Sequence, residues 1–229
     1  KISTEQEYHG YPGPSPEGTH VVFNSRVIDE AGNSQMEIFT ANISTGETYR
    51  LTYNPSFDDS GRWSPDGSEI IFYSNRDGSM DLWKISVNES GYPLETAVKV
   101  LESDAREHCG RWSFDGHYIV YESDKTGVNH LWMMTSDGLN ETQLTFDENQ
   151  NGYPAWHPSG DYIVYNKQTS TSSNLHILSL LDGETKRLTT HQMGVDAHPT
   201  WSADGKYIAF HSDRAGNFDI WIMEIPLTI

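Results

Sequence analysis

Five side chains that could bind a cation or move a proton recur at one position of a repeated sequence pattern. Four copies of the pattern contain a tryptophan, and a carboxylate or an amide stands five residues before it. A fifth, degenerate copy has Pro14 in place of the tryptophan and a histidine at the same offset. The five side chains are those of His9, Asp58, Glu107, Asn151 and Asp196. Because carboxylate and amide oxygens suit hard cations, a divalent cation, Ca²⁺ above all, is expected where they converge.

The carboxylates at this position allow two other roles. Each aspartate could cap its own loop by accepting hydrogen bonds from backbone N–H groups, and no metal would then be needed. Asp58, Glu107 and Asp196 could also serve a glycosidase, which needs carboxyl groups several ångströms apart on either side of the scissile bond. The residue types alone leave these alternatives open.

Aromatic and imidazole side chains occupy the positions just after the carboxylates. Tyr11, Tyr153 and His198 stand three residues before the tryptophan position, and His108 stands four before it. Tyrosine rings stack on sugars or peptides, so these four residues are the predicted ligand contacts. Cys109 follows His108, but neighbours on a strand point to opposite faces, so Cys109 is expected to be a packing residue. The chain has no Gly-x-Ser-x-Gly or His-Glu-x-x-His motif, and nucleophilic catalysis has little support.

The elements that must position these residues follow from the repeats themselves. The tryptophans recur at intervals of 44 to 49 residues, and they are Trp63, Trp112, Trp156 and Trp201. Each is followed by a tight turn such as Ser64–Gly67 and then by a β-branched and aromatic run such as Ile70–Tyr73. A polar turn and two further short strands complete each copy. Four short strands per copy are typical of one blade of a β-propeller, which must stack on its neighbours to bury its apolar face.

The sequence therefore predicts an all-β fold, a five-bladed β-propeller of four-stranded antiparallel blades in one domain, residues 1–229. The last copy runs out of chain after the strand Asp219–Met223, and Lys1–Thr4 resembles the outer-strand segment Lys186–Thr189. We expect the N-terminal strand to join the last blade and close the ring, which removes an open sheet edge.

The placement of the candidate residues follows from this architecture. The innermost strand of each blade lines the central channel, so equivalent positions form rings around its mouth. The tryptophans are expected to be packing wedges between blades. Arg76 and Arg214, in the turns that surround the same mouth, are expected to bridge to neighbouring carboxylates.

The strings Trp-Ser-Pro-Asp-Gly, Ser-Asn/Asp-Arg-x-Gly and Asp-Leu/Ile-Trp resemble the TolB-type (WD-repeat-like) propeller repeat of bacteria. The resemblance covers nearly the whole chain. Such repeats occur in the periplasmic protein of the Tol system, in oligopeptidase propellers and in oligogalacturonate lyases. The α/β domains that accompany two of these are absent from this sequence. The resemblance implies a periplasmic or secreted protein, and the lyases would imply a histidine-rich Mn²⁺ site for which no motif matches here.

Charge and composition exclude several classes of partner. Fifteen lysines and arginines stand against 33 aspartates and glutamates, a net charge of −18. That balance argues against nucleic acid and anionic membrane surfaces, and no apolar run is long enough for membrane insertion. No signal peptide is visible and the chain starts at Lys1, so a processed N-terminus is possible.

These observations favour a non-enzymatic binding or scaffold propeller, expected to be a monomer. It would hold Ca²⁺ in the axial channel and present the rim to a protein or carbohydrate partner. The alternative is a hydrolase or lyase that acts on a polysaccharide with the carboxylates at the channel mouth. A third possibility is a scaffold whose channel holds only water.

Overall fold

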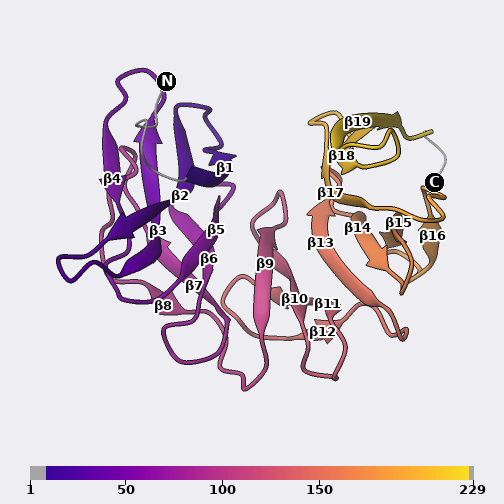
Figure 1. Ribbon diagram of the computed structural model, residues 1–229, viewed down its shortest axis with the longest axis horizontal. Coiled ribbons are helices and arrows are strands. Elements are labelled where there is room, and N and C mark those ends of the chain that lie inside the picture. Colours follow the sequence, from indigo (N-terminus) through magenta and orange to yellow (C-terminus); the bar gives the residue numbers. More distant parts are fainter. Residues whose placement is uncertain (1–8, 227–229) are drawn as a thin grey trace. The chain divides into compact units, whose positions relative to one another are not determined.

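All regular elements of residues 9–226, which the computed structural model describes, are β-strands (Figure 1). Within these residues no helix is long and apolar enough to cross a membrane. The chain divides into two compact units, Lys1–Trp112 and Ser113–Ile229. The prediction of a single domain stays a prediction.

The first unit contains nine strands within its described part. They are β1 (His9–Pro14), β2 (His20–Ile28), β3 (Ser34–Asn42), β4 (Thr48–Arg50), β5 (Asp58–Trp63), β6 (Glu69–Ser74), β7 (Asp81–Ser86), β8 (Val98–Lys99) and β9 (Glu107–Trp112).

The second unit contains ten strands within its described part. They are β10 (Tyr118–Ser123), β11 (His130–Thr135), β12 (Thr142–Gln143), β13 (Gln150–Trp156), β14 (Tyr162–Gln168), β15 (Ser173–Ser179), β16 (Thr185–Arg187), β17 (Asp196–Trp201), β18 (Tyr207–Ser212) and β19 (Asp219–Glu224).

The strands form five sheets in which each strand pairs with the next along the chain. The sheet orders are β1-β2-β3-β4, β5-β6-β7-β8, β12-β11-β10-β9, β13-β14-β15-β16 and β17-β18-β19. This is the meander predicted for each copy, and the five-bladed all-β propeller fold is confirmed. The fifth blade has three strands among the described residues. Its expected fourth strand, Lys1–Thr4, lies outside them.

The tight turn after each tryptophan has the geometry that its residues predict. In the second blade, Gly67 N donates to Ser64 O at 3.0 Å, and Gly67 has a φ of 73°. Ser64 Oγ donates to Asp66 Oδ1 at 2.6 Å and accepts from Glu69 N at 2.9 Å. The Ser-Pro-Asp-Gly string therefore sets the turn that joins the two inner strands of the blade.

The tryptophans pack where neighbouring blades meet. Trp156 is buried in a cluster with Val120 and Leu131 of the third blade and Ile163 and Tyr165 of the fourth. Trp63 packs in the same way against a cluster that joins the first two blades. The prediction that these residues are wedges is therefore confirmed for Trp63 and Trp156.

Each innermost strand contains one residue in the left-handed backbone region. Tyr11, Ser60, Cys109, Tyr153 and His198 all stand three residues before the tryptophan position, and their φ angles lie between 48° and 57°. The pairing register shifts next to four of them, as in a β-bulge. A side chain in this region costs about 1 kcal/mol or more, and bulges of this kind redirect side chains.

Candidate functional site

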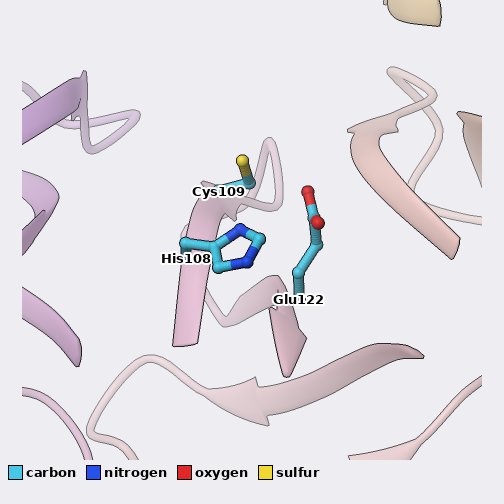
Figure 2. A group of neighbouring side chains, drawn as sticks. All are labelled: His108, Cys109 and Glu122. Atoms are coloured by element: carbon cyan, nitrogen blue, oxygen red, sulfur yellow. The ribbon is translucent and has the colours of Figure 1, made fainter. Parts of the chain in front are cut away.

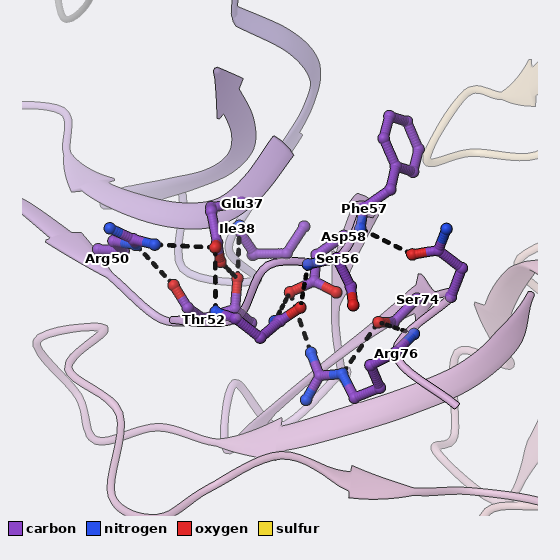
Figure 3. Close-up of polar contacts among 11 residues, drawn as sticks. Glu37, Ile38, Arg50, Thr52, Ser56, Phe57, Asp58, Ser74 and Arg76 are labelled. Atoms are coloured by element: carbon purple, nitrogen blue, oxygen red, sulfur yellow. Dashed lines mark hydrogen bonds and ion pairs between the residues drawn. The ribbon is translucent and has the colours of Figure 1, made fainter. Parts of the chain in front are cut away.

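Asp58 begins β5 and is held inside its own blade. Its side chain is fully buried, and Oδ2 accepts from Arg76 Nη2 at 3.0 Å and from Asn54 Nδ2 at 2.6 Å (Figure 3). Arg76 Nε also donates to Ser74 Oγ at 2.9 Å. The guanidinium therefore balances the buried carboxylate, as the sequence predicts for Arg76.

Asp196 begins β17 and repeats this arrangement in the fifth blade. It is fully buried, and Oδ1 accepts from Arg214 Nη2 at 2.7 Å. Burial raises its pKa, but hydrogen bonds from Arg214, Ser212 and Thr189 more than offset this, so the pKa lies below the usual value. His191 Nδ1 lies 3.6 Å from the same oxygen. Asp196 is thus a charged group with its counter-ion in place.

Asn151 on β13 occupies the equivalent position of the fourth blade without a charge. It is fully buried, and its Nδ2 donates to Asn149 O at 2.9 Å. The residue that corresponds to Arg76 and Arg214 is Thr169. The second and fifth blades therefore have both the carboxylate and the arginine, whereas the fourth blade has an amide and a threonine in their places.

The other two predicted cation ligands are placed by their strands. Glu107 begins β9 and is fully buried, and its backbone N donates to Met80 O at 2.6 Å. His9 begins β1, where it pairs with Ser25 of β2.

Three of the predicted ligands each have one buried side-chain oxygen that accepts no hydrogen bond from the described residues. Asp58 Oδ1, Asn151 Oδ1 and Asp196 Oδ2 have no hydrogen-bond partner among the described residues. A buried acceptor without a partner is costly, so such an oxygen favours a bound cation or an ordered water. The donor set fits Ca²⁺ chemistry. Asp58 belongs to the first unit and the other two to the second, so a single shared cation stays a prediction.

Tyr153 and His198, two of the four predicted ligand contacts, lie together in the second unit. Their ring centroids are 3.7 Å apart, and His198 is exposed. The row continues through His211, whose ring lies 4.5 Å from that of His198, to the exposed Phe218 at 5.1 Å. Burial lowers the pKa of His211, although Asp213 and Asp196 oppose this, so the ring is neutral at pH 7. We call Tyr153, His198, His211 and Phe218 the aromatic row.

Glu122 on β10 fixes the inner end of the aromatic row. It is buried, and its Oε1 accepts from Tyr153 N at 2.7 Å while Oε2 accepts from Asn129 Nδ2 at 2.6 Å. A Cβ at Gly152 would lie 2.8 Å from Oε2, so only glycine fits beside the carboxylate. The bulge that orients Tyr153 is therefore bound by a glutamate from the neighbouring blade.

Sequence reasoning missed Glu122, His211 and Phe218. His211 pairs across the strands with Ala197, the residue just before His198, and it holds the same repeat position as Glu122. Glu122 and Phe218 carry no repeat signal, since other residue types stand at their positions in the other blades.

The expectation for His108 and Cys109 needs a correction. The two residues are neighbours on β9 (Figure 2), yet ligand atoms of their side chains lie within 4.8 Å of each other. Strand alternation fails here because Cys109, with a φ of 55°, is the left-handed bulge residue. Cys109 is buried, as expected of a packing residue. Glu122, the third side chain drawn, belongs to β10 and to the second unit.

Tyr11, the fourth predicted ligand contact, lies in the first unit. Its side chain is exposed, and its backbone O accepts from Arg62 Nη1 at 3.0 Å. Within the second unit the structure brings Tyr153 and His198 together, and the role of all four residues as ligand contacts stays a prediction.

Comparison with known proteins finds a family match in the last part of the chain. The family model described as the TolB beta propeller domain matches residues 148–227. An uncharacterized protein of Agrobacterium fabrum is 30% identical over 83 residues, which is 36% of this chain and 26% of the relative. This chain thus spans about a quarter of that protein.

Solved structures extend the likeness over the whole fold. TolB from Acinetobacter baumannii matches with a TM-score of 0.76 and 16% identity, over 97% of this chain and 53% of its own. A protein described as putative TolB from Agrobacterium tumefaciens matches with a TM-score of 0.67 and 17% identity, over 99% and 93%. An oligogalacturonate lyase in complex with manganese matches with a TM-score of 0.72 and 18% identity, over 97% and 66%. At these identities the likeness concerns the fold.

Proposed function

Because this chain is built of TolB-type propeller repeats, we propose that it is a non-enzymatic binding protein that presents the aromatic row to a protein or carbohydrate partner. The observation that carries the proposal is the state of the carboxylates that an enzyme would need. Asp58, Glu107 and Asp196 are fully buried, and Arg76 and Arg214 bind two of them within their own blades. A carboxylate held by an arginine is a poor proton donor, because the ion pair favours its charged form.

The aromatic row supports binding as the role of the rim. An exposed imidazole stacked on a tyrosine, with a further exposed phenylalanine in the same row, offers flat apolar faces together with polar edges. Such groups are enriched where proteins contact peptides or sugars. Glu122 holds Tyr153 in place before a ligand arrives, which lowers the entropic cost of binding.

A divalent cation, Ca²⁺ in the first instance, is the second part of the proposal. It is supported by the buried oxygens of Asp58, Asn151 and Asp196 that lack protein partners, and by a net charge of −18 that attracts cations. The residues would hold the ion by direct coordination or through water. Its role would be structural, since the three oxygens are buried.

The experiment that tests the proposal measures cation content, melting and turnover on the same preparation. We expect Ca²⁺ to raise the melting temperature over chelator-treated protein, and no turnover on a panel of polysaccharides that includes oligogalacturonate. The variants Asp58→Asn, Glu107→Gln and Asp196→Asn separate the alternatives. Turnover by the parent protein that disappears in these variants with the melt unchanged would establish the hydrolase or lyase instead, and Mn²⁺-dependent turnover would point to lyase chemistry.

A chelator that leaves the melting temperature untouched would refute the cation and leave a scaffold with a wet channel. The binding role is tested separately by His198→Ala, which should weaken partner binding without changing the melt. We further propose that the protein is a periplasmic or secreted monomer. Fractionation of the native host and sedimentation of the purified protein test these two statements.

A further inference from the structure

A cavity of about 800 Å³ lies in the first unit, and Asp58 is not among the residues that line it. It is enclosed by the β1–β2 turn, the β5–β6 turn and the loop after β7. Trp63, in its wall, ends β5, whereas Asp58 begins that strand. The cavity is therefore at the opposite end of the blade from the candidate site, and its role does not rest on the proposed function.

A small residue borders the cavity at one repeat position. Ser15 directly follows the position of the tryptophan in the first blade, and His157 is its counterpart in the fourth. The His157 ring packs edge-to-face on Trp201 with centroids 4.6 Å apart, and its Nε2 donates to Gly205 O at 3.3 Å. An imidazole thus fills in the fourth blade the space that stays open beside Ser15.

Two aromatic rings form one wall of the cavity and are held in fixed positions. His20 lies against Trp63 with centroids 6.4 Å apart. Its Nε2 accepts from Asn42 Nδ2 at 3.2 Å, which makes Nδ1 the protonated atom, and this donates to Thr19 Oγ1 at 2.9 Å. His20 is buried and its ring is tilted by 50° to that of Trp63, so the half-buried Trp63 supplies the apolar face of this wall and His20 packs beside it.

The remaining walls carry groups that bind hydroxyls. Asn88 uses its Oδ1 for the backbone N–H groups of Ser90 and Tyr92, which leaves its Nδ2 to donate outward. Glu17 and Glu89 are exposed and line the cavity with both oxygens available as acceptors. Glu17 Oε1 lies 3.1 Å from the place of a Cβ at Gly67, so this carboxylate reaches across to the second blade.

The charge of the cavity selects against anions. Asp66 also lines it and stays ionised, because hydrogen bonds from Ser64 and Ser68 hold its pKa below the usual value. No lysine or arginine is among the described residues that line the cavity. A uronate or a phosphate would meet only like charge there. A neutral ligand with many hydroxyls would meet acceptors, a donor and an aromatic face.

We propose that this cavity is a binding site for a neutral pyranose, as one residue of a short uncharged oligosaccharide, stacked on Trp63 and hydrogen-bonded by Glu17, Glu89 and Asn88. The volume lies within the range of small-ligand pockets. The site would give the protein a second carbohydrate contact on the turn face of the first two blades.

The test uses the full chain and isothermal titration with cellotriose, maltotriose and chitotriose, with trigalacturonate as the anionic control. The variant Ser15→His introduces the residue that the fourth blade already tolerates. We expect it to weaken binding of the neutral sugar at least about tenfold, since it fills the stacking space. His157→Ser is the matched control, because it changes the same position in another blade and should leave the affinity unchanged.

Glu89→Arg, an exposed loop change that does not threaten the fold, should also weaken the neutral sugar and improve binding of trigalacturonate. Parent protein that binds none of the three neutral probes at about 10 mM, where a site of about 1 mM would be mostly filled, refutes the site. Equal affinity in the parent and the Ser15→His variant, or a parent preference for trigalacturonate, refutes it as well. A loss of affinity confined to Ser15→His and Glu89→Arg supports it.

Discussion

The junction between the first and second blades and that between the fourth and fifth are built from the same repeat, yet one is hollow and the other filled. Trp63 and Trp201 hold equivalent places, as do Gly67 and Gly205. In the filled junction, His157 packs on the tryptophan and bonds the glycine carbonyl. A Cβ at Gly205 would lie 2.3 Å from His157 Nε2, so the glycine is required there for space as well as for its φ of 70°.

The two junctions differ at this position in one side chain, His157 in the filled junction and Ser15 in the hollow one. Serine stands at this position in the second, third and fifth blades, where it donates to the aspartate two residues on and so belongs to the turn. In the fourth blade His157 stands in for the serine, since its Nδ1 accepts from Ser159 N at 3.0 Å, and the turn is kept. Such positions are where a repeat protein can acquire a site without losing its fold.

The largest effect is expected from removal of residues 1–6, which include Lys1–Thr4, the segment that the sequence predicts to be the fourth strand of the fifth blade. Ile220 and Ile222 of β19 are exposed, and a partner strand that covered them would contribute about 4 kcal/mol. We expect the melting temperature to fall by about 10 °C. Hydrogen exchange should speed up in β18 and β19 and not in β5 and β6. If hydrogen exchange speeds up equally in both pairs of strands, or if the melting temperature does not change, residues 1–4 are not the fourth strand of the fifth blade.

The next effect tests whether the two buried ion pairs contribute equally. Arg76→Ala should lower the free energy of unfolding by about 3 kcal/mol, because it leaves Asp58 buried and uncompensated. Arg214→Ala should cost less, about 2 kcal/mol, since Asp196 keeps its hydrogen bonds from Ser212 and Thr189 and Arg214 is about a third exposed. Urea titrations measure both.

The double variant Arg76→Ala, Asp58→Asn is the control for that comparison. It should recover most of the lost stability, because the buried charge is gone together with its partner. If the double variant is as unstable as Arg76→Ala, the arginine acts through packing on Trp83, over whose ring it lies at 4.4 Å, rather than through charge.

His157→Ser should cost about 1 kcal/mol, the value of an aromatic pair of this geometry, when unfolding is followed in urea. The reverse exchange, Ser15→His, should cost no more than about 1 kcal/mol, the value of the hydrogen bond that the buried Ser15 Oγ accepts from His20 N at 3.0 Å, because the cavity has room for the ring. A large destabilisation by Ser15→His would show that the hollow junction is not equivalent to the filled one.

The smallest effect concerns pH. The pKa of Asp196 is lower in the folded protein than its usual value, so its contribution to stability is present above about pH 3.9 and is lost as pH falls through the folded pKa. Asp196→Asn should therefore flatten the stability profile below about pH 4. Urea midpoints at several acidic pH values measure this, and a profile as steep as that of the parent would assign the acid sensitivity to other carboxylates.

The repeat period made most of the fold predictable. A spacing of 44 to 49 residues, the Ser-Pro-Asp-Gly turns and the β-branched runs are local signals, and each of them reports on one blade alone. The ion pairs of Asp58 with Arg76 and of Asp196 with Arg214 could be predicted from the sequence for the same reason, because both partners belong to one blade. The left-handed residues were not, because tyrosine, serine, cysteine and histidine share no preference for a positive φ.

The sequence by itself determined the number of blades, the order of the strands and the register that aligns Asp58, Asn151 and Asp196, since periodicity and turn chemistry act over a few residues. Only the tertiary structure decided that these side chains are buried on arginines or amide contacts, and that Tyr153 meets His198 at 3.7 Å. It alone showed that Ser15 leaves open the space that His157 fills. Those outcomes depend on contacts between side chains of two blades. The local sequence of one blade does not specify the volume and charge of the side chains that the next blade places against it.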